Sequence, residues 1–228
     1  MFQTMARPAA SLLAALLLFP TSNGAYEVPL ASRSVRDAYF LGQRNNESTD
    51  AFLEKYTRRF PIPTRGPHIF EVRLLTPYAQ AVEISRHKTL GYSAQQAEAE
   101  YKTRGDSLLV RVRIDFTPTY NDVMSVKPTK DDESQPNIAP RPYDFWKDFR
   151  FLLTQNGEPL QYRNISGEPQ FCVGEGPTCT QSFPGVLVGA YVNLDYDARS
   201  VPSQKTQVEV FTPDGQHVVA SFDLAALR

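Results

Sequence analysis

The chain has 228 residues, and its 24 lysines and arginines nearly balance its 25 acidic residues, so its formal net charge at pH 7 is -1. This balance excludes the broad basic surface with which proteins bind nucleic acids or anionic lipids. Hydrophobic residues make up 41% of the chain, which at this length is enough to build a buried domain core.

The first 25 residues have the organisation of a secretory signal peptide. Arg7 supplies the positive charge, and residues 9–19 form an almost unbroken apolar run, too short for a stable transmembrane helix of about 20 residues. Small residues favour cleavage after Gly24 or Ala25, and no cysteine lies nearby to carry a lipid. We therefore expect a mature protein that is secreted or periplasmic and has no stable membrane span.

The segment 26–66 is expected to be helical and irregular. A capping pattern that starts at Ser34 predicts a helix ended by Gly42. A second helix is predicted over 50–60, because Pro61 prevents its continuation.

Downstream of this segment the apolar residues repeat with a period of two, which predicts strands. One strand is predicted over 70–75, and another around Val82 and Ile84. A helix then follows, because Ser93 and the glutamine three residues later form a capping box and Gly105 is placed to end the helix.

The clearest strand covers 107–117, where apolar residues alternate with polar ones. Residues 125–142 contain four prolines and a run of charges, which predicts an exposed loop. Asn156 and Gly157 predict a hairpin turn. Further strands are predicted over 149–153, 160–165, 186–196, 208–210 and 218–224.

These patterns predict a mainly β fold. Seven or eight antiparallel strands, each with one apolar face, predict a β-sandwich of immunoglobulin-like or related type over 67–228. Two or three short helices, mostly N-terminal, complete the prediction.

Cys172 and Cys179 are the two cysteines of the chain, separated by six residues. In an oxidising compartment such a pair normally forms a disulfide, here one that closes a turn containing glycine and proline. A metal site and a redox-active pair are the alternatives, but the spacing matches neither pattern.

Side chains that commonly carry catalysis occur here without a recognisable pattern. His68, His87 and His217 lack the mutual spacing of metal ligands, and no nucleophile motif is present, so we expect no metal and no cofactor. One enzymatic alternative stays open, a carbohydrate-active hydrolase that uses two paired carboxylates. The candidates for that pair are Asp115, Asp195 and Asp197.

Several aromatic and basic residues are candidates for a surface that binds a partner. Trp146 has the opposite strand parity to Phe149 and Phe151, which predicts an outward side chain that can contact a sugar ring or a protein. Covering the rim of the core is nevertheless the common role of such a residue. The predicted binding residues are Trp146, Tyr143, Arg150, Arg111 and Arg113.

Arg73, Arg111, Arg113 and Arg150 lie on predicted polar strand faces. If their strands are neighbours, they form a basic stripe that suits an acidic partner or a polysaccharide. Acidic residues on the same faces favour cross-strand ion pairs instead.

The sequence thus favours an exported, non-catalytic binding or scaffolding module of the cell envelope or extracellular space. Its expected partner is an envelope or extracellular protein, or a polysaccharide. The hydrolase remains an alternative, as does a carrier of a small apolar ligand, which requires a cavity between the sheets. Sequons at Asn46 and Asn164 have meaning only in a eukaryotic secretory pathway.

We expect Cys172 and Cys179 to be bonded in the exported protein. For so short a loop the entropy relation gives a stabilisation of about 2 to 3 kcal/mol. Alkylation of freshly exported protein in denaturant without reductant, followed by mass spectrometry, checks the pairing. Recovery of two alkylated thiols contradicts it.

Overall fold

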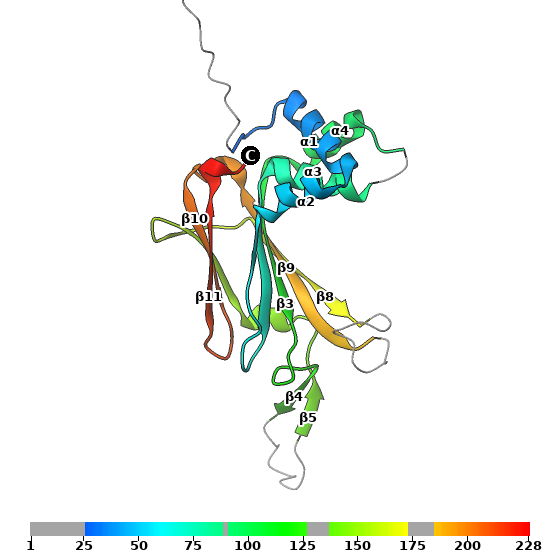
Figure 1. The fold of residues 1–228 in the computed structure, drawn as a ribbon. Coiled ribbons are helices and arrows are strands. Elements are labelled where there is room, and N and C mark those ends of the chain that lie inside the picture. Colours follow the sequence, from blue (N-terminus) through cyan, green and yellow to red (C-terminus); the bar gives the residue numbers. More distant parts are fainter. Residues whose placement is uncertain (1–25, 89–90, 127–136, 173–184) are drawn as a thin grey trace, which may run out of the picture.

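A computed structural model describes residues 26–88, 91–126, 137–172 and 185–228. Within these residues the fold is mainly β, with antiparallel sheets and four α-helices (Figure 1), which confirms the predicted class. The predicted signal peptide, residues 1–25, lies outside the described residues.

The strands form two larger antiparallel sheets and a two-stranded ribbon. The first sheet has the order β1-β2-β3-β9-β8, the second has the order β11-β10-β6-β7, and β4 pairs with β5 in the ribbon. The strands are β1 (Thr57–Arg59), β2 (His68–Leu75), β3 (Ser107–Asp115), β4 (Val123–Val126), β5 (Asn137–Pro140), β6 (Arg150–Gln155), β7 (Glu158–Leu160), β8 (Asn164–Phe171), β9 (Leu187–Asp197), β10 (Lys205–Phe211) and β11 (His217–Asp223).

Apolar side chains from the two larger sheets form one continuous core. On β3, from Leu108 onward, every second side chain is buried and the intervening ones are partly exposed, as the period of two predicts. The same alternation holds along β9 from Ala190 onward. The cluster includes Val72, Val110, Val192, Leu153, Val208 and Phe222.

The described residues contain eleven strands, whereas we expected seven or eight. The additional strands are short. Strands β1 and β7 have three residues each, and β4 and β5 have four each. The strands β4 and β5 also overlap the segment 125–142 that the sequence predicts to be a loop. Runs of three or four residues are too short to show a periodicity.

Four α-helices gather at one end of the sheets, and the β4–β5 ribbon projects from the other end (Figure 1). Their bounds are α1 (Ser32–Arg44), α2 (Glu47–Glu54), α3 (Pro77–His87) and α4 (Ala94–Arg104). Three short 3-10 helices are also present, η1 (Phe145–Asp148), η2 (Ala198–Ser200) and η3 (Leu224–Ala226).

The start and end of α4 confirm the prediction. Ser93 and Gln96 form both hydrogen bonds of a capping box, and Gly105 follows the helix with a φ of 76°.

Two features of α1 and α3 correct the predictions. Gly42 lies inside α1 and does not end it, and a Cβ there would stand only 2.4 Å from the carbonyl oxygen of Val82 on α3. The glycine therefore permits close packing of the two helices. The strand predicted around Val82 and Ile84 is instead part of α3, because Thr76 caps the helix and Pro77 opens it.

The second predicted helix is shorter than expected. Asn46 caps α2 by accepting backbone N–H bonds from Ser48 and Thr49, and α2 ends at Glu54. The chain then continues as β1, which pairs with β2 at the edge of the five-stranded sheet.

Two turns agree with their sequence signals. Asn156 and Gly157 both have positive φ, 52° and 84°, and they join β6 to β7. The turn at 213–215 joins β10 to β11.

The C-terminal residues connect the helices to the sheets. The carbonyl oxygen of Arg228 accepts hydrogen bonds from the hydroxyls of Tyr56, at 2.6 Å, and Thr76. The Arg228 guanidinium lies 4.3 Å from the ring centre of Tyr78 on α3 and 3.4 Å from Asp37 on α1. Sheets and helices are therefore joined at this point as well as through the core.

Val110→Asp is expected to lower the free energy of unfolding by more than about 3 kcal/mol, because Val110 is 1% exposed and a buried carboxylate there has no partner. Arg111→Ser, one residue along on the opposite face, should cost less than about 1 kcal/mol. Urea unfolding followed by circular dichroism measures both. The reverse ranking would contradict the register of β3.

Candidate functional site

The structure separates the five predicted binding residues into distinct places. Arg111 and Arg113 lie together on the outer face of the five-stranded sheet. Tyr143 lies between the ribbon and η1, and Arg150 belongs to the four-stranded sheet. Only the two arginines of β3 therefore share a surface.

Trp146 is buried, which corrects the prediction that it faces outward. Its side chain is 9% exposed and belongs to the core. A Cβ on Gly167 of β8 would stand only 2.0 Å from its indole Nε1, so the strand covers the ring. The parity rule fails because Trp146 lies in η1, where a period of two does not apply.

Tyr143 and Arg150 are exposed in different settings. The Tyr143 side chain is 63% exposed, and its ring contacts that of Phe171 edge-to-face at 5.3 Å. The Arg150 guanidinium lies 4.0 Å from the ring centre of Phe211, which stacks on His217 at 4.2 Å. Arg150, Phe211 and His217 are direct neighbours on three adjacent strands.

The outer side chains of the five-stranded sheet form a polar surface, which we call the arginine face. Cross-strand pairing places Arg73 opposite Arg111, and Glu71 opposite Arg113. Arg111 is in turn opposite Asn193, and Arg113 is opposite Tyr191. The face comprises Arg59, Glu71, Arg73, Arg111, Arg113, Asp115, Tyr191, Asn193, Ser166 and Glu168.

Ion pairs hold these arginines, so the face is not the free basic stripe that unpaired arginines would make. Arg113 Nε lies 2.8 Å from Asp115, and its guanidinium also covers the ring of Phe70 at 4.4 Å. Arg73 and Arg111 share the carboxylate of Glu83, which reaches the sheet from α3. The arginines are thus paired with acidic residues, but with Asp115 on the same strand and with Glu83 on a helix, and not across neighbouring strands as the sequence favoured.

A hollow of about 260 Å³ lies where the helices overhang the arginine face, and we call it the overhang hollow. Arg111 of β3 lines it together with side chains from α3, α4 and the residue after α3. The lining residues are Glu83, Ile84, His87, Lys88, Glu100 and Arg111.

Arg104 follows Glu100 by one helical turn on α4 and is partly exposed. Burial lowers the pKa of its guanidinium, and the charges that act on it include those of Glu100 and Asp195. Within the described part of the chain, Arg104 has no hydrogen bond or ion pair. No sequence signal identified it, because α4 is polar on most of its surface.

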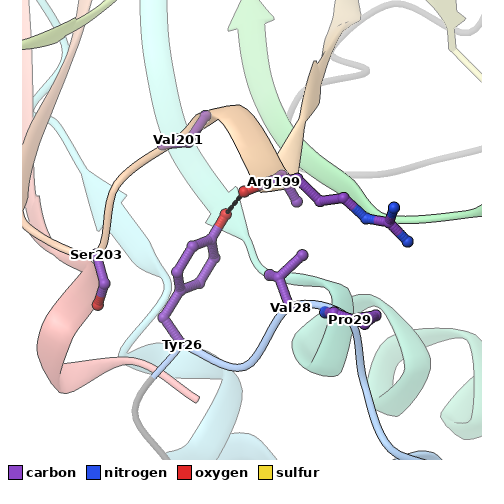
Figure 2. Close-up of a pocket in the computed structure, with 7 residues that line it drawn as sticks. Tyr26, Val28, Pro29, Arg199, Val201 and Ser203 are labelled. Carbon is purple, nitrogen blue, oxygen red and sulfur yellow. Dashed lines mark hydrogen bonds between the residues drawn. The ribbon is translucent and has the colours of Figure 1, made fainter.

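A second, wider hollow of about 480 Å³ opens beside the first described residues. Figure 2 shows Tyr26, Val28 and Pro29 on one side of it, with Arg199, Val201 and Ser203 around them. The Tyr26 hydroxyl donates to the carbonyl oxygen of Ala198 at 2.7 Å, and burial raises the pKa of Tyr26. Arg199, the charged residue of the lining, already binds Asp106 at 2.6 Å.

Of the three carboxylates considered for a hydrolase, Asp115 lies far from the other two, whereas Asp195 and Asp197 are two residues apart on the same face of β9 and both already have partners within the protein. Asp115 is opposite Gly189, six residues before Asp195 on β9, which corresponds to about 20 Å along the strand. Asp195 is held by Arg163 at 3.2 Å and by the hydroxyl of Ser107. Its neighbour along the strand, Asp197, accepts the backbone N–H of Arg199.

The histidines also lie apart. His68 is buried with Nε2 2.9 Å from the carbonyl oxygen of Phe60, His217 contacts Glu209, and His87 lines the overhang hollow. The described residues contain no group of three or more histidine, cysteine or acidic side chains arranged to hold a metal ion.

Cys172 is buried just after β8, and Cys179 lies outside the described residues, so their pairing stays a prediction. Of the two sequons, Asn46 caps α2 and Asn164 is exposed at the start of β8. In the described part of the chain, no helix combines the length and apolar character needed to cross a bilayer.

Comparisons with protein-family models, curated proteins and solved structures find no match to this chain. Its function must therefore be inferred from the chemistry of its own surfaces.

Trp146 is the one tryptophan of the chain, so its fluorescence tests the burial directly. We expect blue-shifted emission and weak quenching by iodide in the native protein. Gly167→Ala should shift the emission to the red, because the new methyl group cannot fit against the indole. Ser166→Ala, at the exposed neighbouring position of the same strand, is the control and should leave the emission unchanged. Strong quenching of the wild type would contradict the burial.

Proposed function

We propose that this protein is an exported, non-catalytic module that binds an extended polysaccharide across the arginine face. The observation that carries the proposal is the run of polar side chains over β2, β3, β9 and β8, among which Tyr191 is a partly exposed aromatic residue. Polysaccharides offer many hydroxyl groups and apolar ring faces, and this combination of side chains is complementary to both.

The ion pairs support binding by holding the polar groups in place. Arg111 donates through Nε to Asn193 at 2.9 Å and contacts Glu83 at 3.5 Å. Arg113 is held between Asp115 and the ring of Phe70. Because these side chains are already ordered, less conformational entropy is lost when a ligand binds.

Two alternatives have less support. The hydrolase needs two carboxylates about 5 to 10 Å apart and free to act. Asp115 is far from Asp195, and the neighbours Asp195 and Asp197 are both engaged, Asp195 by Arg163 and Asp197 by the backbone N–H of Arg199. The carrier of an apolar ligand needs a cavity between the sheets, whereas their apolar side chains pack into one cluster.

Affinity electrophoresis through gels that contain soluble polysaccharides tests the proposal. The wild type should be retarded by at least one polysaccharide, and Tyr191→Ala should weaken that binding about tenfold, which corresponds to ~1.4 kcal/mol. Arg150→Gln, on the other sheet, is the control and should behave as the wild type. Unretarded migration in every gel, or equal binding by Tyr191→Ala, would contradict the proposal.

A further inference from the structure

We propose that the β4–β5 ribbon is an interface between two copies of this chain, in which β4 of one protomer lies antiparallel to β4 of its partner across a two-fold axis. The inference does not depend on the proposed polysaccharide binding. It concerns the end of the sheets from which the ribbon projects, opposite to the helices (Figure 1).

The ribbon exposes much apolar surface for its size. Its two strands have four residues each, yet they carry three of the nine large apolar side chains that are exposed in the described part of the chain. These three are Val123, Met124 and Ile138, and within the described residues none of them packs against either apolar cluster. Because a two-stranded ribbon is only marginally stable in water, further strands beside it cover this surface and stabilise it.

Hydrogen bonds at the base of the ribbon show which backbone groups point outward. The Arg141 N–H donates to the carbonyl oxygen of Asp122 at 2.6 Å, so these two residues bond across the ribbon. Bonded and non-bonded positions alternate in an antiparallel pair, so the backbone groups of Val123 and Ser125 point away from β5. The N–H of Val123 accordingly donates to the side chain of Asn121, at 3.1 Å, and not to β5.

The two edges of the ribbon differ in their capacity to pair. On β5 the outward positions are Ile138 and Pro140, and a proline has no N–H to donate to a further strand. The outer edge of β4 contains no proline, and within the described residues no strand lies along it. The edge of β4 is therefore the one that can accept another strand.

This edge is complementary to itself. A two-fold axis at Met124 places Val123 of each protomer opposite Ser125 of the partner subunit. Both outward positions of the strand then face outward positions of the partner and can exchange backbone hydrogen bonds. Because β4 contains no charged residue, no like charges meet near the axis. An identical strand thus satisfies the edge, which favours a second copy as the occupant.

Pairing at this edge produces a four-stranded sheet in the order β5-β4-β4-β5. Met124 lies opposite Ala139 within the ribbon, and across the axis it lies opposite Met124 of the partner subunit. The row of side chains on this face is therefore apolar over all four strands. Sheets of three or more strands with an apolar face are the ones that are stable independently.

Disulfide crosslinking of the exported protein tests the register. At the axis the two Met124 residues form a non-hydrogen-bonded pair with Cα atoms about 4.5 Å apart, within the range for a disulfide. Met124→Cys should therefore give a covalent dimer on non-reducing gels after mild oxidation. Ala139→Cys is the matched control on the same face. Its two copies would lie three strand spacings apart, roughly 14 Å, so it should give no more dimer than the wild type.

Sedimentation velocity tests the edge itself, and the wild type should sediment as a dimer. Ser125→Pro removes one outward N–H from each protomer while the bonds to β5 are kept, so it should raise the dimer Kd by at least about tenfold. Ile138→Pro, the matched change on β5, removes an N–H from the other edge and should leave the dimer unchanged. Circular dichroism checks that both variants fold.

A wild type that is monomeric at its highest soluble concentration overturns the inference. A dimer that Ser125→Pro leaves unchanged also overturns it, because such a dimer uses another surface. The same holds if Met124→Cys crosslinks no better than Ala139→Cys, and this comparison decides the question if Ser125→Pro does not fold. An intact dimer that binds no polysaccharide contradicts the proposed function alone.

Discussion

The register of β3 is the constraint on which the rest of the structure depends. This strand pairs with β2 on one side and β9 on the other, and its alternate side chains enter the core. The intervening positions place Arg111 and Arg113 on the outer face. Because side chains alternate strictly, a slip of one residue would bury these arginines and expose the valines beside them. One pairing therefore determines both the core and the proposed binding surface.

The helices have a different relation to this sheet. Their own apolar cluster, around Val35, Tyr78 and Val82, holds them together. They contact the sheet through polar groups as well, because Glu83 reaches Arg73 and Gln80 donates to the carbonyl oxygen of Ser107. The helices thus cover one end of the arginine face, and the overhang hollow lies between them and β3.

Elements with long, regular patterns could be predicted from the sequence. The alternation over β3 and β9, the capping box of α4 and the turn at Asn156 are local features, and each corresponds to an element of the structure. The helix α3 could not be recognised, because two apolar residues such as Val82 and Ile84 fit both a strand and a buried helix.

The candidate site was less predictable than the fold. Arg111 and Arg113 could be found because they lie within the clearest strand. That Arg73 is opposite Arg111 depends on which strands pair, and this is decided by packing across the whole chain. Trp146 was misplaced because a single 3-10 turn reverses the side on which a residue lies.

Two arginines of the arginine face, Arg73 and Arg111, form ion pairs with one carboxylate, that of Glu83. Glu83 is largely buried, so a carboxylate left there alone would be costly. Because Arg73 also contacts this carboxylate, Glu83 has a charged partner even without Arg111. The ion pair between Arg73 and Glu83 therefore ties α3 to β2 independently of the contact that Arg111 makes.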